Sequence, residues 1–260
     1  MWIFSENENQ RIYRKMGYYS DQDGILRRYS NEAQNWKQHL ENTKTFICKS
    51  AIDKQKNKAA ILGSGWLLDV PVKELSEIFR EIWLFDIRHT AYIYNKIKIL
   101  KNIIPVEKDI SGIAVPIYRT MKSAGKSNKS LQFNSIKPIF DFSLEDFDFI
   151  VSCNLLDQLD AIPLEYLQEH HEIESEDEIF LRTNIQKAHL NILPKSKSCL
   201  IADYEEYNLD RQDQMLNIKK LLYPEITELN NSETWIWKFD THCSYRPDIQ
   251  TWYKVVAFNL

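Results

Sequence analysis

Two glycines separated by a single residue, in Gly63-Ser64-Gly65, are the first residues of this chain whose spacing indicates chemistry. They follow a short apolar run and precede a helical pattern, and glycines at such a turn let a ligand approach the backbone closely. Asp86 follows about 20 residues later and ends the next apolar run, where a carboxylate can accept hydrogen bonds from two ribose hydroxyls. A tight turn and an unrelated surface acid are the simpler interpretation. The combination of strand, turn, helix, strand and acid favours a nucleotide-type ligand.

A buried parallel sheet is the element that must position these residues. Strand-like apolar runs alternate with helical patterns along the middle of the chain, which is typical of parallel strands covered on both faces. The runs are 58–62, 81–87, 102–106, 147–153 and 198–202. The carboxyl ends of such strands share one edge of the sheet, and ligands bind at that edge in doubly wound folds.

The end of the chain departs from this alternation. Thr234–Phe239 and Thr251–Phe258 are strand-like, and the polar connection between them has no room for a helix. Strands that lie this close in sequence pair antiparallel. The predicted fold class is therefore α/β, a doubly wound and mostly parallel sheet with an antiparallel C-terminal strand pair.

The first 50 residues contain no strand-like run. From Asn31 to Ile47, apolar residues recur at near-helical spacing, which predicts an amphipathic helix packed on the rest of the chain. We therefore expect residues 1–54 to form an N-terminal helical cap, acting as a lid or a substrate-recognition element. Residues 55–260 are expected to form the α/β domain.

Over residues 55–260, the order of elements and the C-terminal strand pair resemble the class I S-adenosylmethionine-dependent methyltransferases, which have a Rossmann-like fold. The run from Ile61 to Gly65 is similar to their first motif, and Asp86 to the acid that holds the ribose of the cofactor. Asp109 matches an acidic position that often contacts the adenine amino group, and Asn154 lies where the family lines its methyl-transfer site. The resemblance implies methyltransferase activity with S-adenosyl-L-methionine as the cofactor. The implied cofactor-binding residues are Gly63, Ser64, Gly65, Asp69, Asp86, Ile87, Asp109, Ile110 and Asn154.

The chain departs from that family's pattern at two positions. Ile61 stands where an acid often precedes the first glycine by two residues, and Leu67 stands in place of a third glycine. Asp69 follows closely and is either a substitute for the missing acid or the N-cap of the next helix. The fourth strand continues into Ser152–Leu159, which lacks the Asn/Asp-Pro-Pro-Tyr signature of amino-group methylation. The sequence therefore leaves the methyl acceptor open, a small molecule or another partner.

No side chain is assigned as a catalytic residue. Methyl transfer from a sulfonium needs alignment of donor and acceptor rather than a protein nucleophile. His89 follows Asp86 closely and could contact cofactor or acceptor, whereas His189 lies in a helical pattern and is interpreted as structural. His170-His171 is better explained as a polar helix end than as a metal site, and no metal is expected.

Cysteine and tryptophan residues have simple interpretations. Cys153 and Cys199 fall in predicted central strands, where cysteine packs as a small apolar residue. The four cysteines form no CxxC pair, which indicates free thiols in a reducing compartment. Trp235 and Trp237 alternate along a strand and share one face, for core packing or, as the minority interpretation, a stacking platform.

Composition excludes several classes of protein. The 260 residues are 43% hydrophobic and 27% charged, which is typical of a globular protein rather than a disordered or collagen-like one. A formal charge of -4 argues against non-specific nucleic-acid binding. No apolar run reaches the roughly 20 residues that span a bilayer, and the first residues do not resemble a signal peptide. The expected location is therefore cytoplasmic, with no membrane partner.

The stretch Ser111–Ile139 is rich in basic residues and contains no acid. Its Ser/Gly-rich centre is expected to be a solvated loop between the third and fourth strands. The simple interpretation is a surface insertion. The alternative is that Lys122, Lys126 and Lys129 recruit an anionic acceptor.

Two alternatives to a methyltransferase stay open. An NAD-dependent oxidoreductase would share the glycine turn and the acid, but it would carry a third glycine and would not usually end in this strand pair. A non-catalytic binding module on a degenerate methyltransferase scaffold would explain the departures at Ile61 and Leu67. A bound adenosyl sulfur compound would favour the methyltransferase, and a bound dinucleotide the oxidoreductase.

Overall fold

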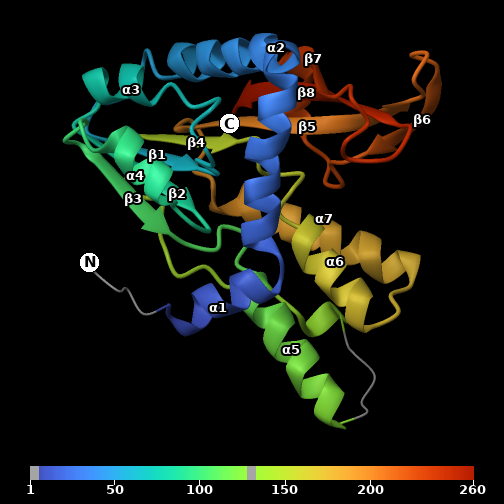
Figure 1. Cartoon of the computed structure of the whole chain (residues 1–260). Coiled ribbons are helices and arrows are strands. Elements are labelled where there is room, and N and C mark those ends of the chain that lie inside the picture. Colours follow the sequence, from blue (N-terminus) through green and yellow to red (C-terminus); the bar gives the residue numbers. More distant parts are fainter. Residues whose placement is uncertain (1–5, 128–132) are drawn as a thin grey trace.

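The computed structural model describes residues 6–127 and 133–260 and places them in one mixed sheet with helices on both faces (Figure 1). The helices are α1 Glu8–Lys15, α2 Tyr18–Ser50, α3 Val72–Ile78, α4 Ala91–Ile97, α5 Ala114–Ser127, α6 Ala161–His170 and α7 Ser175–Ile192. The strands are β1 Lys58–Leu62, β2 Glu81–Asp86, β3 Ile103–Glu107, β4 Phe149–Cys153, β5 Ser198–Leu209, β6 Met215–Lys220, β7 Glu233–Asp240 and β8 Gln250–Asn259.

The strand order confirms the predicted fold class. The order is β3-β2-β1-β4-β5-β8-β7, the first five strands run parallel, and β8 pairs antiparallel with both β5 and β7. Leu62 at the end of β1 lies opposite Phe85 on β2 and Ser152 on β4. The loops that follow these three strands therefore open at the same edge of the sheet, as a doubly wound topology requires.

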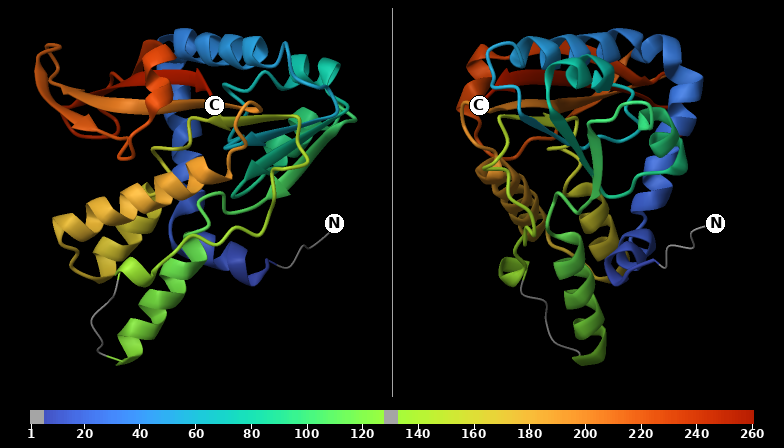
Figure 2. Two further views of the ribbon diagram at one scale, coloured as in Figure 1. Left: turned by 180° about the vertical axis from the view of Figure 1, so that it is seen from behind. Right: turned by 90° about the vertical axis from the view of Figure 1, so that its left-hand side faces the viewer.

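Both faces of the sheet are buried, which is why its parallel strands are continuously apolar. Along β1, Ala59 and Ile61 belong to one core cluster, and Ala60 and Leu62 belong to the other. The first cluster is covered by α3, α4 and the second half of α2, and the other cluster by α1, α5, α6 and α7 (Figure 2). The result is a three-layer arrangement that holds the strand ends rigidly.

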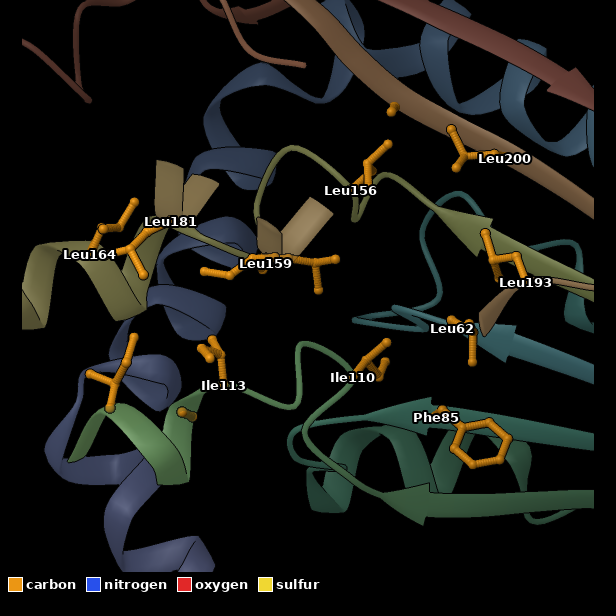
Figure 3. Close-up of a cluster of buried hydrophobic side chains, with 14 of the residues drawn as sticks. Leu62, Phe85, Ile110, Ile113, Leu156, Leu159, Leu164, Leu181, Leu193 and Leu200 are labelled. Atoms are coloured by element: carbon orange, nitrogen blue, oxygen red, sulfur yellow. The ribbon is translucent and has the colours of Figure 1, made fainter. Parts of the chain in front are cut away.

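Part of the second cluster is drawn in Figure 3. Leu62, Phe85 and Leu200 come from the strands, and Leu164 and Leu181 come from α6 and α7. Full burial of a leucine side chain contributes about 1.5–3 kcal/mol to folding. Helix α7 therefore fixes the connection between β4 and β5 against the sheet.

The predicted N-terminal helix over Asn31–Ile47 is confirmed, but it extends further in both directions as α2. In Figure 1 its first half runs vertically beside the sheet, and its second half lies across the top. The indole of Trp36 stacks on Phe239 at 5.5 Å between ring centroids and donates from Nε1 to Phe239 O at 2.9 Å. The division into a cap of residues 1–54 and a domain of residues 55–260 stays a prediction. No helix among the described residues is long and apolar enough to cross a membrane.

The expectation of a loop over Ser111–Ile139 is wrong for most of its first half. Ala114–Ser127 forms α5, because Ala114, Ile117 and Met121 recur at helical spacing and are buried against the sheet. The many basic residues of this stretch suggested a solvated loop, and the helical spacing of its apolar residues was therefore missed. Residues 128–132 lie outside the described part of the chain, so Lys129 does as well.

Strand β6 was not predicted, and β5 is longer than the run 198–202. The second half of β5 pairs with β6, and every residue of β6 is exposed. A strand exposed on both faces has no alternation of apolar and polar residues from which it could be recognised. The polar second half of β5 is nonetheless buried at several positions, because it pairs with β6 on one side and β8 on the other, and Glu206 in it lines the cavity described next.

Candidate functional site

A cavity of about 550 Å³ opens where β1 to β5 end, beneath the first half of α2. This volume falls in the range of roughly 300–1,000 Å³ that is usual for small-molecule sites. Its walls come from the loops after β1, β2, β3 and β4, from the second half of β5, and from β7 and β8. Helix α2 contributes side chains along its length, among them Tyr18, Gln22 and His39.

The glycine turn lies at the end of the cavity near β1 and β2. Gly63 has a φ of +76°, and a Cβ added there would lie 2.9 Å from the main-chain oxygen of Cys153. Gly65 has a φ of +48°, and its N–H donates to Asp86 Oδ2 at 2.7 Å. Both positions therefore require the freedom of glycine, and the turn is joined directly to the acid. Ser64 is buried and does not line the cavity.

Leu67 follows the turn and adopts a backbone conformation that glycine prefers. Its φ is +53°, and its side chain is buried in the core. The main-chain oxygen of Leu67 accepts a hydrogen bond from Lys96 Nζ at 2.8 Å. The loop thus keeps a left-handed residue where the resembled family has a third glycine.

Asp86 ends β2 as predicted and lines the cavity. Besides its bond with Gly65, its Oδ1 accepts hydrogen bonds from the N–H of Ile87 at 2.8 Å and from Gln22 Nε2 at 3.2 Å. Burial raises the pKa of this carboxyl, and the backbone donors oppose that rise. The side chain is thus held in one orientation, with α2 supplying one of its partners. Ile87 also lines the cavity.

Asp109 lies beside this end of the cavity and also initiates α5. Its Oδ1 accepts from the N–H of Ser111 at 2.9 Å, and its Oδ2 from the N–H of Ala114 at 3.0 Å. This pattern is that of a helix cap, in which a carboxylate satisfies orphan backbone donors. Ile110 is buried next to it and lines the cavity.

Asp69 is not the N-cap of α3, so that interpretation is wrong. The helix begins at Val72 with Pro71 at the cap position. The side chain of Asp69 lines the cavity and accepts a hydrogen bond from Asn154 Nδ2 at 2.6 Å. Burial raises the pKa of Asp69. Asn154 itself has a φ of +46°, so the chain turns sharply after β4 to place this amide.

His39 of α2 lies next to the Asn154 amide, and no role was predicted for it. Its Nε2 lies 3.3 Å from the Asn154 amide, and its Nδ1 accepts from Trp235 Nε1 at 3.1 Å. Burial lowers the pKa of His39 to about 3, so the ring is neutral. The spacing of His39 from Trp36, which shares its helix face, is the signal that could have found it.

Other predicted side chains lie elsewhere. His89 does not line the cavity: it is buried, with Nε2 2.9 Å from the main-chain oxygen of Leu84. His189 is buried and bonded to Ser152, as expected of a structural residue. Cys153 and Cys199 are buried, and burial raises the pKa of the Cys199 thiol to about 12. No group of His, Cys, Asp and Glu in the described ranges could hold a metal ion.

The opposite end of the cavity is acidic and aromatic, which the sequence did not predict. Asp157, Asp203 and Glu206 line it together with Trp237 and Tyr253. Asp157 Oδ1 accepts from the N–H of Asp203 at 3.0 Å. Asp203 directly follows the run 198–202. The criterion that identified Asp86, an acid at the end of a predicted strand, could therefore have identified Asp203 as well. Trp235 and Trp237 do share one face, and Trp237 both packs in the core and lines the cavity.

Comparison with known proteins adds the following. No family model matches the chain, and no curated protein matches its sequence. Among solved structures it is similar to 1,6-didemethyltoxoflavin-N1-methyltransferase of Burkholderia thailandensis, with 8% identity and a TM-score of 0.43 over 100% of this chain and 93% of that one. It is also similar to N-methyltransferase NodS of Bradyrhizobium japonicum WM9, with 11% identity and a TM-score of 0.39 over 85% and 87% of the two chains. At these values the functional inference rests on the residues of this chain.

Proposed function

We propose that the chain is an S-adenosyl-L-methionine-dependent methyltransferase that acts on a small molecule. The observation that carries this proposal is the bonded pair of Gly65 and Asp86 at the open edge of a doubly wound sheet. At this pair a ligand can come close to the glycine backbone, and the carboxylate can accept hydrogen bonds from both hydroxyls of a ribose. The cavity is also large enough to accept a second small molecule beside a nucleoside.

The residues at this end of the cavity fit that cofactor. Gly63 lines the cavity, and a Cβ there would clash with the main-chain oxygen of Cys153, so glycine keeps this turn close to the end of β4. Asn154 Oδ1 is a buried acceptor without a partner among the described residues, so a bound donor would satisfy it. When bound, S-adenosyl-L-methionine supplies an activated methyl group, and the protein has to align it.

Each cofactor-binding residue has a proposed task. Asp86 holds the ribose, Asp109 contacts the adenine through lone pairs that its helix cap leaves free, and Ile87 and Ile110 pack against the base. Asp69 and Asn154 lie toward the middle of the cavity, where donor and acceptor would meet. The neutral ring of His39 positions the Asn154 amide.

A binding experiment separates the three functions that the sequence left open. A ligand at 100 times its Kd stabilises the folded state by about 2.7 kcal/mol, which raises Tm by roughly 2–4 °C per kcal/mol. We expect this shift with S-adenosyl-L-methionine or S-adenosyl-L-homocysteine and none with NAD. A shift with NAD alone would identify the oxidoreductase. A shift with neither would contradict the proposal and leave the non-catalytic module.

A further inference from the structure

The acidic end of the cavity contains carboxylates that the chain itself does not neutralise. Asp203 is 1% exposed, and its Oδ1 has no hydrogen-bond partner among the described residues. Asp157, its neighbour, accepts a hydrogen bond from the N–H of Asp203. A buried carboxylate without a partner is costly, so an unpartnered one in a cavity wall indicates a ligand with donors or positive charge.

Two of the basic side chains that line the cavity are paired with acids of the chain. Glu206 is bonded to Arg246 at 2.7 Å, and Arg182 is paired with Asp160. Within the described ranges, no Lys, Arg or His nitrogen comes within 4.0 Å of either Asp157 or Asp203. These two acids are therefore free to bind a cation from outside.

Aromatic rings stand next to these acids. Tyr253 lies opposite Glu206 in the pairing of β5 with β8, and Trp237 lies opposite Tyr253 in the pairing of β8 with β7. Phe239 extends this wall, with ring centroids 4.9 Å from Trp237 and 5.0 Å from Tyr253. The wall already holds one cation of the chain, because the guanidinium of Arg28 lies 4.5 Å from the Phe239 ring centroid. Aromatic faces and carboxylates together recognise organic ammonium groups.

We propose that this end of the cavity binds a primary or secondary amine in its ammonium form through Asp157 and Asp203. This amine site rests on the proposed function, and it assigns amines as the class of methyl acceptor. Methylation of such a nitrogen forms one N–C bond, breaks the S–C bond of the donor with its electron pair left on sulfur, and releases one proton. Asp157 or Asp203 takes that proton from the ammonium group, which frees the nitrogen lone pair. Lys122 of α5 does not line the cavity and has no part in this step.

Three probes of similar shape and different charge test the site. We would measure the affinities of 2-phenylethylamine, 2-phenylethanol and 3-phenylpropanoate at pH 7 by titration calorimetry, with S-adenosyl-L-homocysteine titrated separately. The amine should bind at least tenfold more tightly than the alcohol or the carboxylate. Asp203→Asn and Asp157→Asn should each weaken amine binding at least tenfold and leave S-adenosyl-L-homocysteine binding unchanged. Glu165→Gln, which removes an exposed acid of the cavity rim, is the matched control and should change nothing.

The outcomes distinguish this inference from the proposed function. Equal binding of the three probes, or full amine affinity in both aspartate variants, would overturn the amine site while S-adenosyl-L-homocysteine binding upholds the methyltransferase. Amine binding that depends on Asp203 without any binding of S-adenosyl-L-homocysteine would overturn the methyltransferase and uphold the site. Asp203 Oδ1 has no hydrogen-bond partner among the described residues, so an amide at this position should be tolerated and the variant should fold.

Discussion

Asp86 shows how much one side chain can do at this edge of the sheet. Its carboxylate receives two backbone N–H groups, from Gly65 and Ile87, and these bonds hold it against the glycine turn. Charged acceptors form hydrogen bonds worth about 1.5–3 kcal/mol, more than neutral ones. The same carboxylate therefore both shapes the turn and presents charge to a ligand.

Replacement of Asp86 by asparagine should separate these two tasks. The amide keeps one oxygen for the backbone but loses the charge, so S-adenosyl-L-homocysteine should bind at least tenfold more weakly while the circular dichroism spectrum stays unchanged. Glu81→Ala, at the opposite end of the same strand, is the matched control. Unchanged affinity in a folded Asp86→Asn protein would return this residue to the simpler interpretation of an acid that only supports a turn.

The acidic pair predicts a pH dependence of stability. Burial raises the pKa of Asp157 to about 7, and burial together with the charge of Asp157 raises the pKa of Asp203 well above its usual range. The folded chain thus binds more protons than the unfolded one, whose aspartates titrate near pH 3.9. This pair's contribution to the free energy of unfolding should therefore fall as the pH rises from about 4 to about 7.

Thermal unfolding at pH 5 and pH 7.5 tests this prediction. Asp203→Asn removes one of the two buried titrating carboxyls, so it should reduce the difference in Tm between the two pH values. Glu165→Gln should leave this difference unchanged. A pH dependence that is the same in wild type and in Asp203→Asn would show that the pair is already neutralised.

At the scale of elements, α2 is the feature that determines access to the site. Gln22 reaches Asp86 Oδ1 from this helix, and its main-chain oxygen accepts from Trp66 Nε1 at 2.6 Å. The helix is thus attached to both the acid and the glycine loop. A ligand hydroxyl that binds Asp86 Oδ1 has to take the place of the Gln22 amide.

Gln22→Ala removes that competitor and should tighten S-adenosyl-L-homocysteine binding. A hydrogen bond to a carboxylate is worth about 1.5–3 kcal/mol, so the expected gain is roughly ten- to hundredfold by calorimetry. The bond of the main-chain oxygen with Trp66 survives the change, so the helix should stay in place. A loss of affinity would instead mean that Gln22 contacts the ligand.

The elements also show which features of the fold the sequence could predict. Strand β1 has the predicted bounds because Lys58–Leu62 is a continuous apolar run that ends at glycine. Helix α5 was missed because its lysines concealed the apolar stripe, and β6 because it has no buried face. The glycine turn at Gly65 and the acid Asp86 could be predicted from their spacing in the sequence. The hydrogen bond between Gln22 of α2 and Asp86 could not be predicted, since no local pattern relates a helix to a strand end 64 residues away.

At the scale of the whole molecule, Glu32 connects the two ends of the chain. This buried carboxylate on α2 accepts hydrogen bonds from the main-chain N–H groups of Thr241 and His242 at 2.8 and 3.0 Å, just after β7. Burial alone would raise the pKa of Glu32, but bonds from Asn35, His242 and Thr241 lower it overall. A lowered carboxyl pKa means that this contribution to stability exists at neutral pH and is lost as the pH falls through the folded pKa.

Glu32→Ala should therefore destabilise the protein and loosen the packing of α2 over the cavity. Loss of a buried carboxylate that satisfies several donors costs about 3 kcal/mol, and α2 should exchange its amide hydrogens faster over residues 18–40. Glu41→Ala, an exposed acid on the same helix, should change neither property. Unfolding midpoints and hydrogen exchange would be measured at pH 7 and at a pH below the lowered pKa of Glu32. At the lower pH the two variants should become more similar, because protonation of Glu32 in Glu41→Ala removes the same bonds. Equal protection of residues 18–40 in the two variants at pH 7 would mean that the stacking of Trp36 on Phe239 is sufficient to hold α2 in place over the cavity.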